Sequence, residues 1–415
     1  MSTKQVVFCT DVQRVAVLSF HTSPLAQPGS GDSGGMNVYV RELSSALAQA
    51  GVECTTYTRR TSADQPDVVA VEPGHRVVHL DAGAHDLPKE ALPSVLGEFG
   101  DAVIDHMKND APADVMHANY FLSGLVAHRL KHELDIPFVS TFHTLAKVKA
   151  EGGDHESEWR HQAEADIIRC ADAICVSCSE EENQFRRLYG NPAGRIEIVA
   201  PGVEHAFFAP GEQSGARNAL GLPLHVPVLL FVGRIQPLKS PDVAVRALAA
   251  LGRPDALLLV VGGASGAEGS AEEQHLRSLV HQLGLTDQVR FVPPQPHHIL
   301  STYYRAADAV VVPSRSESFG LVALEASACG VPVVASGVGG LLTLVDHGEN
   351  GYLVPDRDPD LFAHYLREII DHPNHAAALG QRGAERARRY TWSFAAARLR
   401  RLYTDLGARE LVACG

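Results

Sequence analysis

Short apolar runs rich in β-branched residues alternate with amphipathic helical stretches along most of this chain. That alternation is typical of parallel sheets covered by helices. The chain has 415 residues, too many for one ordinary core and well suited to two domains of about 200 residues each. The sequence therefore predicts an α/β protein with two doubly wound, Rossmann-like domains that face each other across a cleft.

The first half begins with a strand at Arg14–Phe20, a glycine-rich loop and a helix over about Met36–Ala50. Apolar residues recur in that helix at intervals of three and four, as on the buried face of a helix. Further strands are expected at Glu53–Thr58, Val77–Leu80, Val115–His117, Pro137–Phe142, Ala173–Val176 and Ile196–Val199.

Two proline–glycine breaks, Ala200-Pro-Gly-Val and Ala209-Pro-Gly, are the best linker candidates. The pattern then restarts with strands expected at Val226–Val232, Ala256–Val261, Gln288–Val292, Ala309–Val312 and Val331–Ala335, and with a helix from Pro241. We expect one Rossmann-like domain over residues 1–205 and a second over 206–388. A final segment, 389–415, contains an arginine-rich amphipathic helix that we expect to cross back to the first domain.

Charge and hydropathy exclude several classes of protein. The formal net charge of −13 argues against nucleic-acid binding, which requires a basic face. No apolar run approaches the ~20 residues that span a bilayer. Asp11 and Arg14 interrupt the start of the chain, which argues against a signal peptide. We expect a cytoplasmic protein that does not insert into membranes.

The cysteines favour a reduced state. There are seven, an odd and sparse set that predicts free cytosolic thiols rather than a disulfide framework. Cys175 and Cys178 form a lone C-x-x-C in an apolar stretch. A metal or redox role would need a second ligand pair, and none has the right spacing. We interpret both as core residues and expect no metal.

Gly29-Ser-Gly31-Asp-Ser-Gly34 matches the G-x-G-x-x-G pattern of dinucleotide-binding proteins. About eight residues separate it from the preceding strand, whereas a dinucleotide-binding turn begins at the strand end. The second strand lacks a ribose-binding acid, although Arg59 and Arg60 at its end suit a 2′-phosphate. We favour a mobile loop whose amides, with Gly35 at the helix start, face a polar ligand. An NADP-linked oxidoreductase and a plain surface loop are less favoured interpretations of the same pattern.

Two cations follow a strand of the second half. In Phe231-Val-Gly-Arg234-Ile-Gln-Pro-Leu-Lys239 a strand delivers Arg234 and Lys239 into one loop, and Gly233 permits close approach of a ligand. Two such cations suit a pyrophosphate leaving group, and electrostatic stabilisation of this kind is typically worth ~3–4 kcal/mol per donor.

Two acids follow another strand. In Pro313-Ser-Arg-Ser-Glu317-Ser-Phe-Gly320-Leu-Val-Ala-Leu-Glu325, Glu317 precedes a helix and Glu325 is expected two turns into it. Their offset of eight positions corresponds to ~12 Å along a helix axis, near the span from a donor sugar to its nucleotide ribose. The helix amides between them would face the phosphates. Gly262-Gly263-Ala-Ser-Gly266 is a further, weaker glycine turn at a strand end.

The Arg234–Lys239 loop and the E-x7-E segment resemble glycosyltransferase family 4, whose members are retaining enzymes of the GT-B architecture. The resemblance runs from Arg14 to about Tyr403. More specifically, the chain resembles the D-inositol-3-phosphate glycosyltransferases of mycothiol biosynthesis. The segments that carry this likeness are His21-Thr-Ser-Pro-Leu-Ala-Gln-Pro-Gly-Ser-Gly-Asp-Ser-Gly-Gly-Met-Asn37-Val-Tyr, Val232-Gly-Arg-Ile-Gln-Pro-Leu-Lys239 and Ser316-Glu-Ser-Phe-Gly320.

The resemblance implies a hexosyltransferase that moves a sugar from UDP-N-acetylglucosamine to 1L-myo-inositol 1-phosphate. It implies that Arg234 and Lys239 contact the donor diphosphate, that Glu325 binds the ribose and that Glu317 binds the donor sugar. It places His143 beside the reacting sugar and makes it, with Arg234, Lys239 and Glu317, a catalytic residue. Gly35, Ser318, Phe319 and Gly320 complete the implied donor site.

The same resemblance implies an acceptor site. Asn37 would face the acceptor, and its phosphate would be bound by Lys89, Tyr120, Thr144 and Arg160. Two cations and two hydroxyls make a fair phosphate pocket. The partners implied are small molecules, with a UDP or GDP sugar as donor, no required cofactor and no metal; a homodimer is left open.

The first half departs from the family pattern at three places, which the sequence gives as His117-Ala-Asn119-Tyr-Phe121, Ser140-Thr-Phe-His143-Thr144 and Ala163-Glu-Ala-Asp. These departures leave open a paralogue with a different acceptor, such as one that joins a GDP-octose to the thiol ergothioneine in lincosamide antibiotic biosynthesis. A sugar phosphorylase or trehalose-type synthase would share the architecture, and a non-catalytic binding module would bind the donor without turnover. The family implies front-face substitution, in which the departing phosphate accepts the proton.

Overall fold

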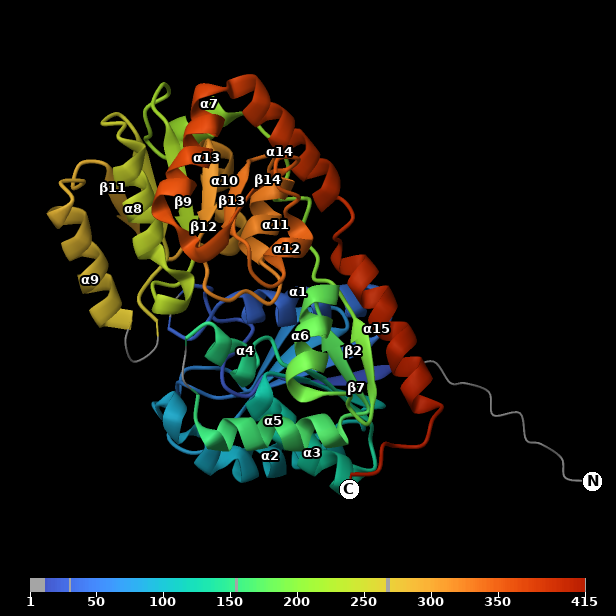
Figure 1. Cartoon of the computed structure of the whole chain (residues 1–415). Helices are drawn as coiled ribbons and strands as arrows, with labels where there is room; N and C mark the ends of the chain where they lie inside the picture. Colours follow the sequence, from blue (N-terminus) through green and yellow to red (C-terminus); the bar gives the residue numbers. More distant parts are fainter. Residues whose placement is uncertain (1–11, 30, 154–155, 266–268, 415) are drawn as a thin grey trace, which may run out of the picture.

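The computed structural model describes residues 12–29, 31–153, 156–265 and 269–414. It has two lobes, each built on a sheet with helices on both faces (Figure 1). This confirms the predicted fold class of two facing α/β domains. Ser30 and Gly266, which belong to two of the predicted glycine loops, lie outside the described residues.

The first lobe contains an eight-stranded sheet in the order β3-β4-β2-β1-β5-β6-β7-β8. All neighbours are parallel except β3 and β4, which are antiparallel. The strands are β1 Arg14–Leu18, β2 Glu53–Arg59, β3 Val68–Glu72, β4 His75–Leu80, β5 Val115–Asn119, β6 Phe138–Thr141, β7 Ala173–Val176 and β8 Arg195–Ile198.

The second lobe contains a six-stranded parallel sheet in the order β11-β10-β9-β12-β13-β14. Its strands are β9 Val228–Val232, β10 Leu257–Val261, β11 Val289–Val292, β12 Ala309–Val312, β13 Val333–Ser336 and β14 Gly351–Val354. Successive residues of β9 enter opposite cores, because Leu229 and Phe231 pack on one face of the sheet and Leu230 on the other. A strand covered on both faces is apolar at every position.

The helices cover both sheets, and the two that begin at Gly35 and Pro241 start near the predicted positions. They are α1 Gly35–Gln49, α2 Leu96–Asn109, α3 Phe121–Leu134, α4 Ala146–Glu151, α5 Glu158–Cys170, α6 Ser179–Tyr189, α7 Gln213–Ala219, α8 Pro241–Leu251, α9 Gly269–Gln282, α10 His297–Ala306, α11 Leu321–Ala328, α12 Leu341–Leu344, α13 Pro359–Asp371, α14 Pro373–Ala387 and α15 Trp392–Gly407. Short 3₁₀ turns occur at Lys89–Val95, Pro237–Lys239 and Pro355–Arg357.

Helix α15 lies along the side of the first lobe, after the chain has returned from the second (Figure 1). Thr391 caps its first turn by accepting a hydrogen bond from the Phe394 amide at 3.2 Å. Its apolar face, which includes Leu399 and Tyr403, joins the core beneath α1. None of the helices in the described ranges has the length and apolar character needed to cross a membrane.

The expectation that all thiols are reduced is wrong for one pair. Cys170, at the end of α5, and Cys414, in the tail after α15, form a disulfide. They are 244 residues apart, and only the return of α15 to the first lobe brings them together. Among the described cysteines the others are free and buried, and these include Cys175 and Cys178 of the C-x-x-C segment.

Candidate active site

A cavity of about 280 Å³ lies between the lobes, lined by residues of both. Most of its lining follows the carboxyl ends of parallel strands, where open α/β sheets bind ligands. Several predicted residues line it: Gly35, His143, Thr144, Arg234, Lys239, Glu317, Ser318, Phe319, Gly320 and Glu325. The structure thus brings together the predicted donor site and His143.

Arg234 lies in the loop that follows β9. Its guanidinium makes only two long hydrogen bonds within the described chain, to the Asp32 carbonyl at 3.4 Å and to Ser265 Oγ at 3.3 Å. No carboxylate of the described residues forms an ion pair with it. Burial lowers the pKa of Arg234, partly offset by the charges of Asp32 and Glu317. A buried cation whose hydrogen bonds are long is well suited to bind an anion.

The glycines at the ends of β9 and β10 let their loops approach closely. A Cβ atom on Gly262 would lie 1.9 Å from the Gly233 carbonyl oxygen, well inside van der Waals contact. Close approach of these two loops shapes the wall of the cavity beside Arg234. It also explains the predicted glycine turn at Gly262-Gly263.

Lys239 and Glu317 come from different strand-end loops and form an ion pair. Lys239 Nζ donates to Glu317 Oε2 at 2.6 Å, and Ser314 Oγ donates to the same oxygen at 3.2 Å. Two adjacent glycines pack against the backbone of Glu317. The Gly340 amide donates to the Glu317 carbonyl at 2.9 Å, and a Cβ on Gly339 would lie 2.0 Å from that same oxygen.

Helix α11 begins at Leu321, so Glu325 is just over one turn inside it and not the two turns expected. The reason is Gly320, whose φ of 106° puts the preceding residues in a loop. The Glu325 carboxylate is buried and lines the cavity. His297 Nε2 lies 2.7 Å from its Oε1, and the Tyr304 hydroxyl donates to its Oε2 at 2.8 Å.

His297, which is half-buried, pairs with the buried Glu325. Burial lowers the pKa of His297, but the adjacent carboxylate more than offsets this, so the net pKa is raised. The pair orients Glu325 within the cavity. His297 and Tyr304 were not predicted, because nothing in their spacing connects them to a residue on the next helix along the chain.

Polar contacts join the lobes across the cavity. Ser318 Oγ donates to the His143 carbonyl, and Ser177 Oγ donates to the Ser318 carbonyl at 3.0 Å. The Arg234 contact with the Asp32 carbonyl also crosses between lobes. The first two bonds hold the segments that follow β6 and β7 against the loop that follows β12, and the third holds the glycine-rich loop against the loop that follows β9.

His143 follows β6 with a φ of 61°, an unfavourable value for a non-glycine residue. Its Nε2 lies 2.9 Å from Asn119 Oδ1, so Nε2 carries the proton and the amide oxygen accepts it. The Tyr39 ring packs edge-on against the imidazole. Burial, with a smaller effect of His117, lowers the pKa of His143 to about 3. The imidazole is therefore neutral near pH 7 and is not a proton donor to an acidic substrate.

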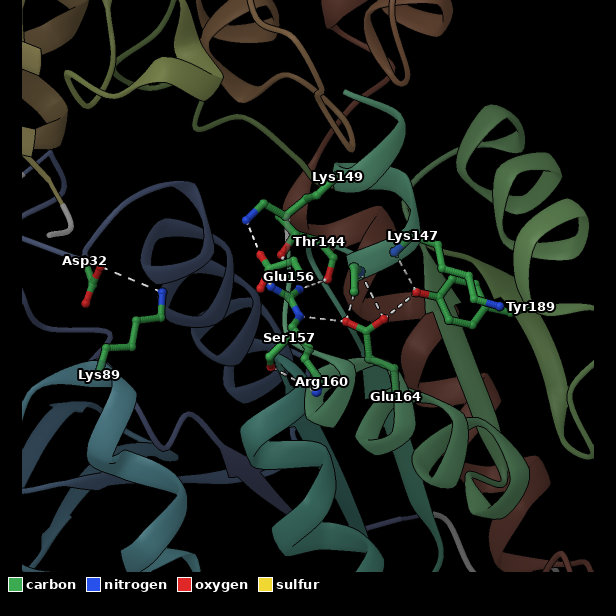
Figure 2. Close-up of polar contacts among 11 residues, drawn as sticks. Asp32, Lys89, Thr144, Lys147, Lys149, Glu156, Ser157, Arg160, Glu164 and Tyr189 are labelled. Carbon is green, nitrogen blue, oxygen red and sulfur yellow. Dashed lines mark hydrogen bonds and ion pairs between the residues drawn. The ribbon is translucent and has the colours of Figure 1, made fainter. Parts of the chain in front are cut away.

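Lys89, Tyr120, Thr144 and Arg160 form one cluster in the first lobe, and Figure 2 shows Lys89, Thr144 and Arg160. The Lys89 ammonium lies 5.5 Å from the centroid of the Tyr120 ring, and the Arg160 guanidinium 5.2 Å from it. Arg160 donates to Thr144 Oγ1 at 3.1 Å. The structure therefore brings together the four predicted phosphate-binding residues.

Carboxylates compensate part of this positive charge (Figure 2). Arg160 pairs with Glu156 at 2.7 Å and with Glu164 at 2.9 Å. Lys89 makes a longer ion pair, with 3.8 Å between its Nζ and Asp32 Oδ1. Burial also lowers the pKa of Lys89. Lys89 is thus the less firmly paired of the two predicted cations. His21 packs on the Tyr120 ring, with 4.5 Å between the ring centroids, and belongs to the same region, although no role was assigned to it from the sequence.

Asn37 is not part of this cluster or of the cavity lining. Its amide donates to Thr22 Oγ1 at 2.8 Å and to the Ser23 carbonyl at 2.7 Å, and its Oδ1 accepts from the Gly34 amide at 2.8 Å. With all these bonds made within one loop, Asn37 fixes the shape of the glycine-rich segment before α1. That segment extends over the second lobe, where Gly34 lies against Arg234.

Two families match the chain, one on each lobe. Residues 34–202 match the family described as "Glycosyl transferase 4-like domain". Residues 212–386 match the family described as "Glycosyl transferases group 1".

Curated relatives match the chain over nearly its whole length. The D-inositol 3-phosphate glycosyltransferase 2 of Catenulispora acidiphila is 45% identical over 421 residues, which cover 97% of this chain and 98% of that protein. The D-inositol 3-phosphate glycosyltransferase of Thermobispora bispora is 45% identical and covers 95% of each chain.

Solved structures agree with this relationship. The sucrose-phosphate synthase of Thermosynechococcus elongatus superposes with a TM-score of 0.90 at 36% identity, over 95% of this chain and 99% of that one. Anabaena HepE, solved with UDP and glucose, gives a TM-score of 0.78 at 19% identity over 95% of this chain and 100% of that one. This second likeness supports the GT-B fold alone.

Proposed function

This chain is a glycosyltransferase that belongs to the family-4 enzymes with the GT-B fold, and on that premise we propose that it transfers N-acetylglucosamine from its UDP derivative to 1L-myo-inositol 1-phosphate, with retention at the anomeric carbon. The relatives named D-inositol 3-phosphate glycosyltransferases support this acceptor, since that is the same compound under the other numbering. The choice of UDP-N-acetylglucosamine rests on the resemblance to the mycothiol-pathway enzymes.

One observation carries the donor half of the proposal: Arg234 lines the cavity with no carboxylate partner among the described residues. A diphosphate bound there would supply the missing anion. As the bond to the sugar breaks, negative charge grows on the departing phosphate, and a preorganised guanidinium stabilises that charge without reorganising. Lys239, five residues further along the same loop, adds a second cation.

The two acids would then bind the ends of the donor. Glu317, beside Lys239, would accept hydrogen bonds from sugar hydroxyls. Glu325, oriented by His297 and Tyr304, would accept hydrogen bonds from the ribose. The first amides of α11 lie between them, where the positive end of the helix favours phosphate.

The acceptor phosphate would bind at the cluster of Lys89, Tyr120, Thr144 and Arg160. Arg160 is held by two carboxylates and would act as a fixed hydrogen-bond donor. Lys89 would supply a positive charge that Asp32, at 3.8 Å, compensates only in part. Tyr120 has a φ of 74°, so the backbone is strained at the start of α3, where this cluster sits.

The residues present favour substitution on the face from which the nucleotide leaves. A double-displacement mechanism needs two carboxylates about 5 Å apart around the sugar. On the first-lobe side the cavity is lined by the neutral His143 and by Glu181, whose Oε2 already accepts hydrogen bonds from the Ser177 amide and hydroxyl and whose pKa is raised by burial. The departing phosphate would accept the acceptor's hydroxyl proton, while this chain positions both substrates and stabilises charge. Closure of the lobes, held by contacts such as Ser318 with His143, would exclude water.

A direct assay tests the choice of donor and the choice of acceptor independently. Purified protein is incubated with UDP-N-acetylglucosamine, UDP-glucose or a GDP sugar, each with inositol phosphate, free inositol or a small thiol, and products are identified by mass spectrometry. We expect the glycosyl-inositol phosphate from the first donor and its phosphorylated acceptor, with an α-linkage by NMR. A product formed equally well from free inositol or from a thiol would contradict the acceptor assignment.

A further inference from the structure

Two imidazoles and the two sulphurs of the Cys170–Cys414 disulfide lie close together on the first lobe, away from the cavity. His128 and His132 lie one turn apart on α3, Cys170 ends α5, and Cys414 is in the tail after α15. One ligand atom from each of the four lies within 4.8 Å of the others. The Cys170 Sγ lies 3.5 Å from His132 Nε2. None of these residues takes part in the proposed transfer reaction.

This set of side chains has the composition of a structural zinc site. Two cysteines and two histidines are a common tetrahedral ligand set for Zn²⁺. Bonds of ~2.3 Å to sulphur and ~2.0–2.1 Å to nitrogen put tetrahedral ligands roughly 3.3–3.8 Å apart. Histidines at i and i+4 lie on one face of a helix and can bind one ion together.

The segments that carry the two sulphurs are held by contacts that do not involve sulphur. Lys131 and Asp172 form a buried ion pair at 2.8 Å. Lys131 Nζ donates to the carbonyls of Cys170, at 2.8 Å, and Val412, at 2.9 Å. Asp172 Oδ1 accepts from the Val412 amide at 2.7 Å. The tail therefore lies beside α3 and α5 whether or not the two sulphurs are bonded to each other.

We propose that these four residues bind one Zn²⁺ ion when the disulfide is reduced. A dithiol supplies two electrons and two protons to the Cys170–Cys414 bond and is itself oxidised to a disulfide; alternatively a phosphine supplies the two electrons, and water supplies the two protons and the oxygen of the phosphine oxide. Either reaction yields two thiols. Zn²⁺ then displaces one proton from each thiol, and His128 and His132 each donate a neutral ring nitrogen. Two thiolates balance the charge of the ion, so a neutral complex replaces the disulfide.

Either the disulfide or the zinc complex would attach the C-terminal tail to the first lobe. Both connect the end of the chain, after α15, to α3 and α5. Oxidation would release the ion and leave the tail attached through the S–S bond. Sequence spacing alone does not indicate this site, because Cys414 reaches it only through the fold.

The full-length chain tests this. After reduction with a phosphine and incubation with Zn²⁺, excess metal is removed by gel filtration and the metal content is measured by mass spectrometry. We expect one Zn²⁺ per chain, and Co²⁺ in its place should give the visible and thiolate-to-cobalt bands of a tetrahedral sulphur–nitrogen site. A strong chelator should release the ion and lower the melting temperature of the reduced protein.

Two variants distinguish this site from adventitious binding. Cys414→Ser changes only the tail, so it should fold, and it should lose the tightly bound ion and the thiolate–cobalt band. Cys54→Ser makes the same change at a buried free thiol in β2 and should retain one ion per chain. The proposal is overturned if the reduced wild type takes up no metal, or if Cys414→Ser binds as much as the wild type.

Discussion

Lys239 Nζ donates a hydrogen bond to Glu317 Oε2 at 2.6 Å, and the two residues come from loops that follow β9 and β12. The ion pair couples the residue proposed to bind the diphosphate to the residue proposed to bind the sugar. A diphosphate would compete with Glu317 for Lys239, and the repulsion between the two anions would oppose nucleotide binding. The sugar hydroxyls attached to the donor would compensate by donating to Glu317.

Replacing Glu317 by glutamine should therefore separate nucleotide binding from catalysis. The change removes one negative charge beside the diphosphate, so UDP should bind about threefold to tenfold more tightly. Turnover of the sugar nucleotide should fall at least about tenfold, because a charged acceptor to the sugar hydroxyls is lost. Calorimetry with UDP and a steady-state assay measure the two effects. Glu385→Gln, an exposed position on α14, is the control; weaker UDP binding by Glu317→Gln would contradict this account.

Arg234→Ala should lower kcat by about 10²–10³, the typical loss for one preorganised donor to a developing charge. The melting temperature should not decrease, since a desolvated guanidinium with two long hydrogen bonds is removed. Steady-state kinetics and thermal unfolding check the two statements. Arg290→Ala on β11 serves as a matched control. Near-wild-type turnover would show that the diphosphate lies elsewhere.

Lys89→Ala should weaken acceptor binding selectively. Loss of a charge-assisted hydrogen bond of about 1.5–3 kcal/mol predicts a rise of roughly 10- to 100-fold in KM for inositol phosphate. The KM for the donor should change less than about twofold, because the donor is proposed to bind the other lobe. Lys108→Ala, at the exposed end of α2, is the control. Equal changes in both KM values would indicate that Lys89 acts on the fold as a whole.

The buried histidines predict loss of stability in mild acid. Burial lowers the pKa of His117 to about 4, against about 6.5 in an unfolded chain. Between these values the unfolded chain binds a proton that the folded protein does not. Stability should therefore decrease as pH falls below about 6.5, by up to about 1.4 kcal/mol per pH unit from this residue. Urea unfolding between pH 7 and pH 5 measures the slope.

The variant His117→Gln isolates this contribution. It removes the titrating ring, which contacts the Tyr403 hydroxyl at 2.6 Å and Thr141 Oγ1 at 2.8 Å. Its stability at pH 7 should be lower, while its dependence on pH should be shallower by about one proton. Parallel pH dependences for wild type and variant would show that folding does not lower the pKa of His117.

The sequence predicted the second lobe well, because the residues proposed to bind the donor follow its strands closely along the chain. The apolar runs before Arg234, Lys239 and Glu317 are easily predicted as strands. Parallel strands bring the loops that follow them to the same edge of the sheet. Two strands were missed. Val68–Glu72 is a half-exposed antiparallel edge strand, and Gly351–Val354 is short and begins with glycine, which is depleted in strands.

Contacts between distant segments were not predictable from local pattern. The pairing of Glu325 with His297 and Tyr304, the hydrogen bond from His143 to Asn119, and the meeting of Cys170 with Cys414 all depend on how elements pack. The resemblance named Lys89 and Arg160 as acceptor residues, but only the structure shows how much of their charge is already compensated by carboxylates.

The most direct test is a crystal structure with the sugar nucleotide soaked in. The account predicts that the diphosphate lies within hydrogen-bond distance of Arg234 and Lys239, with the ribose at Glu325 and the sugar at Glu317. A well-ordered nucleotide bound away from these four residues would contradict it.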